Sequence, residues 1–269
     1  MSEQHAWDFP NPATAPGSAA YYVVRFSPPA QQHMLARWYA WFELLDEIVA
    51  KAKDPGVARL KLDWWREEAD NMLADSARHP LAQALQSAVT SDWQVAQIKR
   101  ALDEAEQRIL RQRAESIEGF LQQGADRQAS RLRLLCEVND SDLGEALEKL
   151  GRFCATVDSL ANLADEVQRD HLPLPKDLSE QAGLSLDDLQ EGRKAEQLAQ
   201  IGEQLLDTLG DCDHRYLASL KNQTTLHPAL RHSAQRLRLA QLLRKHGFGL
   251  DRRHSLTPLG WLWRARRMR

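Results

Sequence analysis

Apolar side chains recur along most of the chain at steps of three and four residues, the spacing of one face of an α-helix. The clearest run is Leu35, Trp38, Trp41, Phe42, Leu45 and Val49. It predicts a helix over residues 31–53. The same spacing predicts helices over residues 55–74, 92–123, 127–137, 143–167, 193–221, 227–246 and 256–267, and a short one from Pro80. No segment shows the convincing alternation with period two that indicates a half-buried strand.

Proline and capping residues mark the ends of these helices. Asp54 followed by Pro55 is typical of an N-cap with proline in the first turn. The sequence HLPLP at 171–175 must interrupt a helix, because proline lacks the amide proton and clashes with the preceding turn. We therefore predict an all-α fold in which residues 1–18 form an extended N-terminal arm and residues 19–269 form a single helical domain.

The composition is that of a globular protein and narrows the possible functions. Apolar residues make up 43% and the net charge is −3, so the chain has no general attraction for nucleic acid. The three cysteines are widely spaced and include no CxxC pair, which argues against a disulfide framework or a zinc site. The first residues do not resemble a secretory signal, and no apolar run reaches the ~18 residues of a membrane span. A cytoplasmic location is the expectation.

Two pairs of adjacent carboxylates on long predicted helices are the main candidates for chemistry: Asp46 with Glu47, and Asp165 with Glu166. Magnesium prefers oxygen ligands and, in phosphate chemistry, is commonly held by one or two carboxylates and the phosphate itself. Two acidic helices facing each other across a bundle would suit a magnesium-bound diphosphate. The alternative is that both pairs are solvated helix faces with ordinary salt bridges, since the chain has 38 acidic residues.

Several short motifs, in order, resemble those of squalene/phytoene synthases. They are residues 17–22 (GSAAYY), 27–29 (SPP), 39–49 (YAWFELLDEIV), 61–68 (KLDWWREE), 79–85 (HPLAQAL), 163–166 (LADE), 172–178 (LPLPKDL) and 258–265 (PLGWLWRA). The resemblance implies an isoprenoid-synthase-like helical bundle with a central apolar cavity. Enzymes of that family condense two prenyl diphosphates head to head, and Mg²⁺ held by two aspartate motifs draws off the diphosphate. Carried over by position, the implied metal ligands are Asp46, Glu47, Asp165 and Glu166, and the implied catalytic residues are Asp46 and Asp165.

The chain also departs from the family pattern at positions that matter. Ala50 stands where the resemblance leads us to expect the last aspartate of the first motif, and Glu43 stands where it leads us to expect an arginine. Asp170 lies one residue beyond the place of the second aspartate of the second motif. A carboxylate in place of an anion-binding arginine would repel a diphosphate.

These departures leave the function open between three interpretations. The chain is a catalytically degenerate member that binds an isoprenoid or its diphosphate, or that acts as a membrane-associated assembly or accessory factor, as a mitochondrial relative does for respiratory complex I. Alternatively, it is an active Mg²⁺-dependent prenyltransferase with altered metal ligation. A third possibility is a structural helical module with a filled core and a protein partner.

Aromatic and basic residues suggest where a lipophilic ligand would bind. The residues to which we assign substrate contacts are Tyr21, Trp38, Trp41 and Arg169. The two tryptophans precede Asp46 by one to two turns and would line a cavity, although packing between helices is the ordinary role of such residues. The end of the chain combines tryptophan with arginine at Trp261, Trp263, Arg264, Arg266, Arg267 and Arg269. This pattern is typical of a peripheral membrane contact, or of a last helix that docks on the bundle.

Overall fold

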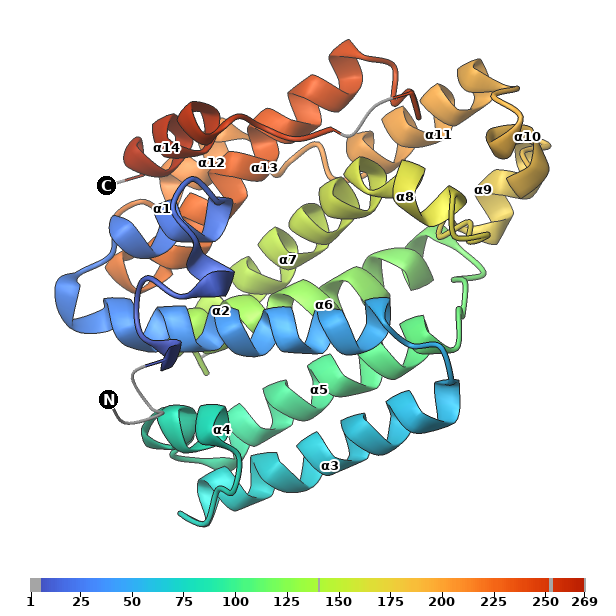
Figure 1. The fold of residues 1–269 in the computed structure, drawn as a ribbon. Coiled ribbons are helices and arrows are strands. Elements are labelled where there is room, and N and C mark those ends of the chain that lie inside the picture. Colours follow the sequence, from blue (N-terminus) through green and yellow to red (C-terminus); the bar gives the residue numbers. More distant parts are fainter. Residues whose placement is uncertain (1–5, 140, 252–253, 269) are drawn as a thin grey trace.

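The computed structural model describes residues 6–139, 141–251 and 254–268, and none of them forms a β-strand. The long helices of this part are α2 (Pro29–Ala50), α3 (Pro55–Leu73), α5 (Asp92–Ile109), α6 (Ile117–Cys136), α7 (Ser141–Ala161), α11 (Ala195–Asp207) and α13 (His227–Lys245). The shorter ones are α1 (Ala19–Arg25), α4 (Pro80–Leu85), α8 (Leu163–Val167), α9 (Lys176–Gln181), α10 (Leu186–Gln190), α12 (His214–Ser219) and α14 (Pro258–Arg266). The predicted all-α single domain is confirmed (Figure 1).

The long helices stack side by side around one core. Helix α6 packs between α5 and α7, with α3 beyond α5 and α13 against α7 (Figure 1). Helices α1 and α14 pack on each other and on α13, near the ends of the chain. Helices α9 and α10 lie at the opposite end of the bundle (Figure 1).

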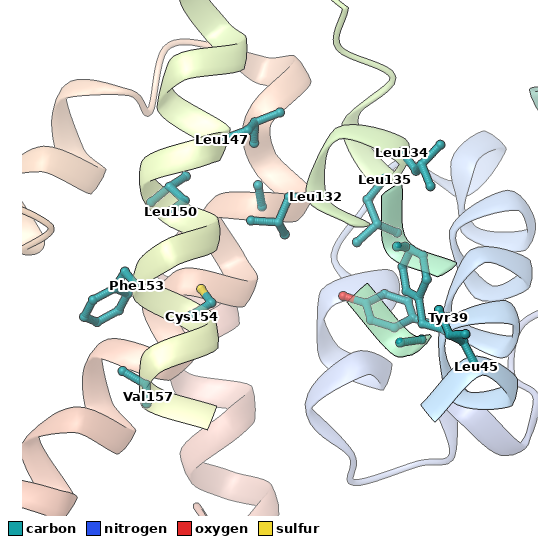
Figure 2. Packing of buried hydrophobic residues seen from close by; sticks show 14 of the residues in the cluster. Tyr39, Leu45, Leu132, Leu134, Leu135, Leu147, Leu150, Phe153, Cys154 and Val157 are labelled. Carbon is teal, nitrogen blue, oxygen red and sulfur yellow. The ribbon is translucent and has the colours of Figure 1, made fainter. Parts of the chain in front are cut away.

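Glycine allows α6 and α7 to approach each other closely. A Cβ on Gly151 of α7 would lie 2.5 Å from the backbone nitrogen of Ala129 on α6, and one on Gly124 of α6 would lie 2.9 Å from Ala155 Cβ. Real side chains do not tolerate such distances, so only glycine lets the two backbones meet. Apolar side chains of α7, such as Leu150 and Cys154, fill the core beside this contact (Figure 2).

Three of the predicted helices are interrupted in the structure, and the one over 143–167 is divided at Asn162 into α7 and α8. The predicted helix over 92–123 is wrong, because α5 ends at Ile109 and α6 begins only at Ile117. Arg111 between them adopts a left-handed conformation with φ 53°, and Ser116 caps α6 by accepting a hydrogen bond from the Gly119 amide. Likewise the predicted helix over 193–221 is divided into α11 and α12, and Asp213 caps the second part.

Residues 6–18, part of the segment predicted as an extended arm, lie along α2. Asn11 is buried, and its side-chain amide donates to the Ala36 carbonyl at 2.9 Å. Asp8 pairs with Arg37 at 2.7 Å. A short 3₁₀ turn, η2 (Pro12–Thr14), lies within this segment, and residues 1–5 lie outside the described part of the chain. These contacts fix the segment around Asp8 and Asn11 on the bundle.

Candidate functional site

A cleft of about 850 Å³ opens into the bundle and is lined mainly by α2, α5, α6, α7, α8 and α13. Its size is that of pockets that hold small organic ligands. Seven arginines and six carboxylates line it, together with apolar side chains such as Phe42, Phe120 and Leu239. The cleft therefore combines charged groups with an apolar surface.

One face of α2 forms a wall of this cleft. Tyr39, Glu43, Asp46 and Ala50 follow one another at steps of three and four residues, and all four line the cleft. The two departures from the squalene/phytoene synthase pattern, Glu43 and Ala50, thus share the cleft wall with Asp46. Burial, and then the charges of Glu47 and Asp46, raises the pKa of Glu43.

Asp46 is held by two arginines from other helices. Arg131 of α6 binds it with both guanidinium nitrogens, Nη1 to Oδ2 at 2.8 Å and Nη2 to Oδ1 at 2.7 Å. Arg108 of α5 donates from Nη2 to Oδ1 at 3.1 Å. Burial alone would raise the pKa of Asp46, but the charges and hydrogen bonds of these arginines outweigh it and hold that pKa far below its usual range. Asp46 is therefore an ionised carboxylate whose two oxygens are already bound.

A third arginine, Arg127 of α6, lies near Asp46, Arg108 and Arg131. Arg127 reaches Ser159 Oγ at 3.1 Å, while the nearest carboxylate oxygen, on Glu104, is 3.9 Å away. Its Nε is buried and has no hydrogen-bond partner among the described residues. Burial, together with the like charges of Arg108 and Arg131, lowers the pKa of Arg127. A guanidinium in such surroundings would be stabilised by an added anion.

On another wall of the cleft, α7 carries a carboxylate, Asp158, that is also paired with an arginine. Asp158 accepts hydrogen bonds from Arg236 of α13, from Nε at 3.1 Å and from Nη2 at 3.3 Å, and one from Gln128 at 3.1 Å. Asn162 and Glu166 follow Asp158 at successive steps of four residues and also line the cleft. The second acidic wall thus begins about two turns before Asp165.

The predicted residues of the second acidic site do reach the cleft. Asp165, Glu166 and Arg169 all line it. His171 Nδ1 donates to Glu166 Oε2 at 2.8 Å, and Arg169 lies 3.5 Å from the other oxygen. The hydrogen bond from His171 is the main cause that lowers the pKa of Glu166, against the opposing effect of burial.

The other predicted residues lie outside the cleft. Trp38 and Trp41 are each 1% exposed and pack edge to face in the core, because α2 turns them away from the face of Asp46. Glu47 is exposed and pairs with Lys51 at 2.9 Å. Tyr21 stacks on Phe9 of the N-terminal segment. The aromatic residues that α2 places in the cleft are instead Tyr39 and Phe42.

Comparison with known proteins agrees with this architecture. A sequence profile described as squalene/phytoene synthase matches residues 13–260. The chain belongs to the squalene/phytoene synthase family. A search of curated protein sequences found no match.

Solved structures share the fold of this family member at low sequence identity. A dehydrosqualene synthase in complex with ligand is 12% identical, with a TM-score of 0.77 over 93% of this chain and 90% of that chain. The squalene synthase HpnC from Alicyclobacillus acidocaldarius is 15% identical, with a TM-score of 0.71 over 88% of this chain and 92% of that chain. At these identities the likeness concerns the fold alone.

The cleft of this squalene/phytoene synthase family member does not fit the family's magnesium ions well. A magnesium ion at Asp46 would have to displace the bidentate guanidinium of Arg131, and neither Ala50 nor the outward-facing Glu47 would add a ligand. Asp158 is paired in the same way with Arg236. Within the described residues, no three Asp, Glu, His or Cys side chains gather as metal ligands.

Sequence reasoning missed the basic half of this site, and local spacing carried only a weak signal for it. The basic residues that were missed are Arg108, Arg127, Arg131 and Arg236, and Asp158, the partner of Arg236, was missed with them. Arg127 and Arg131 are four residues apart, as are Glu104 and Arg108, so each pair shares a helix face. That spacing could have indicated charged faces on α5 and α6, but not that both faces meet Asp46.

Proposed function

We propose that this squalene/phytoene synthase family member binds one prenyl diphosphate by direct contact with arginine and does not condense two of them. The observation that carries the proposal is the double engagement of Asp46 by Arg131 and Arg108. These guanidinium groups occupy the carboxylate that the family pattern assigns to a metal. The chain would therefore be a binding protein or carrier that kept the fold and lost the condensation step.

Arginine is suited to take over the role of a metal in holding the head group. A guanidinium presents a planar set of donors that matches the oxygens of a phosphate, and the contact needs no ion between them. Arg127 has a free buried Nε at the cleft and no close carboxylate partner among the described residues. Arg108, Arg127 and Arg131 lie around two carboxylates, those of Asp46 and Glu104, which do not neutralise all three positive charges. A diphosphate would supply the missing negative charge.

The apolar part of the same cleft would hold the isoprenoid tail. Phe42, Phe120, Leu132, Leu135 and Leu239 line it. Burial of apolar surface supplies most of the affinity for a hydrocarbon chain, at about 25 cal/mol per Å². The arrangement thus favours a ligand with an anionic head and an apolar tail over inorganic diphosphate.

An active Mg²⁺-dependent prenyltransferase is the second candidate. It is favoured by the position of Asp46 and of Asp165 with Glu166 on walls of one cleft, in a family whose enzymes generally use Mg²⁺. For this function the arginines would have to release Asp46 when substrate binds. Asp46 and Asp165 would then be the residues whose loss abolishes turnover.

Calorimetric titration with farnesyl diphosphate separates the two functions. The wild-type protein is titrated in EDTA and again with excess Mg²⁺, with farnesol to measure the contribution of the tail alone. We expect binding of one ligand per chain in EDTA, and a loss of about tenfold or more in affinity for Arg127→Gln. Arg152→Gln is the matched control, because Arg152 lies on α7 and bonds to Gln122 and Glu118 at the surface.

Analysis of the reaction products in the same samples distinguishes the binding protein from the prenyltransferase. A condensed hydrocarbon or its diphosphate formed with Mg²⁺ and NADPH, and abolished by Asp46→Ala and by Asp165→Ala, would overturn the binding-protein proposal. Absence of heat in EDTA, with binding restored by Mg²⁺, would also contradict direct recognition by arginine.

A further inference from the structure

Helix α14 has two faces with opposite surroundings. Residues two apart on a helix are separated by ~200°, so Trp261 points away from both Leu259 and Trp263. Trp261 lines the cleft, with the Arg236 guanidinium 5.8 Å from its ring centre, and its carbonyl accepts a hydrogen bond from Gln235 at 3.4 Å. Leu259 and Trp263 face outward and are 72% and 60% exposed.

The outward face of α14 is strongly basic. Arg266 and Arg267 lie within ~60° of Trp263 around the helix axis, and the Arg267 guanidinium lies 4.8 Å from the Trp263 ring centre. The partly buried Arg264 flanks this face on the side nearer Trp261. No carboxylate in the described part of the chain pairs with these three arginines. Burial, with the like charges of Arg238 and Arg267, lowers the pKa of Arg264. The face therefore carries positive charge that the fold leaves uncompensated, beside two exposed apolar side chains.

Outside α14, the most exposed large apolar side chain of the described residues is that of Leu60, and its surroundings differ. Leu60 of α3 is 69% exposed and borders an apolar groove between α2 and α3. The arginines of α3 are neutralised: Arg59 pairs with Glu106 at 2.7 Å, and Arg66 pairs with Asp103 and Glu106. Lys61, beside Leu60 in that groove, is the one cation of α3 without a carboxylate partner among the described residues, whereas α14 carries three such arginines.

We propose that α14 docks on the surface of an anionic lipid bilayer, with Leu259 and Trp263 in the interface and the neighbouring arginines on the lipid head groups. Tryptophan and arginine on one side of a short helix are the groups that bind at this depth. No helix in the described residues is long and apolar enough to cross a membrane, so the contact is peripheral.

This docking would place the cleft at the lipid surface. Trp261 lines the cleft from the same helix, about half a turn from the side chains that enter the interface. A ligand with an isoprenoid tail would pass between bilayer and cleft with little exposure to water. This last consequence rests on the proposed function, whereas the docking itself does not.

Vesicle flotation of the ligand-free protein tests the docking. One set of vesicles contains phosphatidylcholine with phosphatidylglycerol, and the other contains phosphatidylcholine alone. We expect binding to the anionic vesicles that weakens as salt is raised, and little binding to the neutral ones. The variant with Leu259→Ser and Trp263→Ser should lose about tenfold or more in partitioning, and Arg266→Gln should lose about fivefold.

Leu60→Ser is the matched control, since it removes an equally exposed leucine from a face where Lys61 is the one uncompensated cation among the described residues. It should bind vesicles like the wild type. Equal binding by the Leu259/Trp263 variant, or by both vesicle types, would overturn the proposal. So would a change from dimer to monomer in sedimentation velocity for that variant, because the face would then join two copies of the chain. Failure of farnesyl diphosphate binding would leave these vesicle results unchanged.

Discussion

Arg131 and Asp46 form a bidentate ion pair across the cleft, although they are 85 positions apart in the chain. Arg131 is almost buried, with 8% of its side chain exposed, while Asp46 keeps 45%. The pair joins α6 to α2 at the point where the family pattern assigns a metal ligand. If this ion pair persists when ligand binds, Asp46 has a structural role. If Arg131 releases it, Asp46 can bind a cation.

Asp46→Asn should destabilise the fold, because it leaves the charges of Arg131 and Arg108 in the cleft wall without their carboxylate. We expect a loss of about 1–3 kcal/mol in the free energy of unfolding, less than for a fully buried pair because Asp46 is partly exposed. Urea unfolding at pH 7 measures it. Glu47→Gln, on the adjacent exposed position, should change stability by less than about 0.5 kcal/mol. Equal effects of the two substitutions would show that the arginines do not depend on Asp46.

Glu43→Gln should strengthen the binding of farnesyl diphosphate in EDTA. Burial and the neighbouring carboxylates raise the pKa of Glu43, which shows that its negative charge is unfavourable where it lies. Removal of that charge from the cleft wall should increase affinity roughly threefold or more at pH 7.5. Calorimetry measures the change, and Glu47→Gln again supplies a control outside the cleft. Weaker binding by Glu43→Gln would indicate that Glu43 contacts the ligand or a cation favourably.

The fold could be predicted from the sequence, as could three of the four candidate carboxylates at the cleft, Asp46, Asp165 and Glu166, but the partners of Asp46 could not. Helical spacing predicted the bundle, and the order of the motifs indicated these acidic residues. Arg108 and Arg131 are 62 and 85 positions from Asp46, and nothing in local spacing indicates which of many arginines reaches it. Such pairing is set by how α5 and α6 pack against α2.

Trp38 and Trp41 show a second limit of prediction from sequence. They are close to Asp46 along the chain, which suggested a role in the cavity, but α2 carries aromatic side chains on both its core face and its cleft face. Periodicity alone therefore could not say which of the two faces meets the cavity. Similarly, the break between α5 and α6 depends on contacts with a distant segment, such as the Lys176 amide donating to the Ala114 carbonyl at 3.0 Å.

Gly151→Ala should destabilise the contact between α6 and α7 that supports the cleft. The new methyl group would lie 2.5 Å from the Ala129 backbone nitrogen, and backbone cannot move aside as a flexible side chain can. We expect a loss of about 1–3 kcal/mol in the free energy of unfolding. Gly119→Ala in α6 is the control, because its nearest neighbour would be at an ordinary 3.6 Å, and it should stay within about 1 kcal/mol of wild type. Thermal and urea unfolding of both variants compare the two positions.

His232 should make the stability of the protein depend on pH below neutrality. It lines the cleft and is 7% exposed, its Nδ1 lies 3.5 Å from the Tyr39 hydroxyl, and its Nε2 has no partner among the described residues. Burial, and then the charges of Arg236 and Arg131, holds the pKa of His232 well below its usual range. The imidazole is therefore neutral in the folded protein at pH 7.

The sign of the effect follows from which state binds the proton. The unfolded chain protonates this histidine near its ordinary pKa of about 6.5, while the folded state does not until a lower pH. Stability is therefore unaffected above about pH 6.5 and falls as the pH drops below it, by up to about 1.4 kcal/mol per pH unit from this group. Urea unfolding of wild type and His232→Gln between pH 7.5 and 5 should show a shallower fall for the variant. His214→Gln, at an exposed position on α12, should keep the wild-type slope, and parallel curves for wild type and His232→Gln would mean that the folded protein already accommodates a charged imidazole beside Arg236.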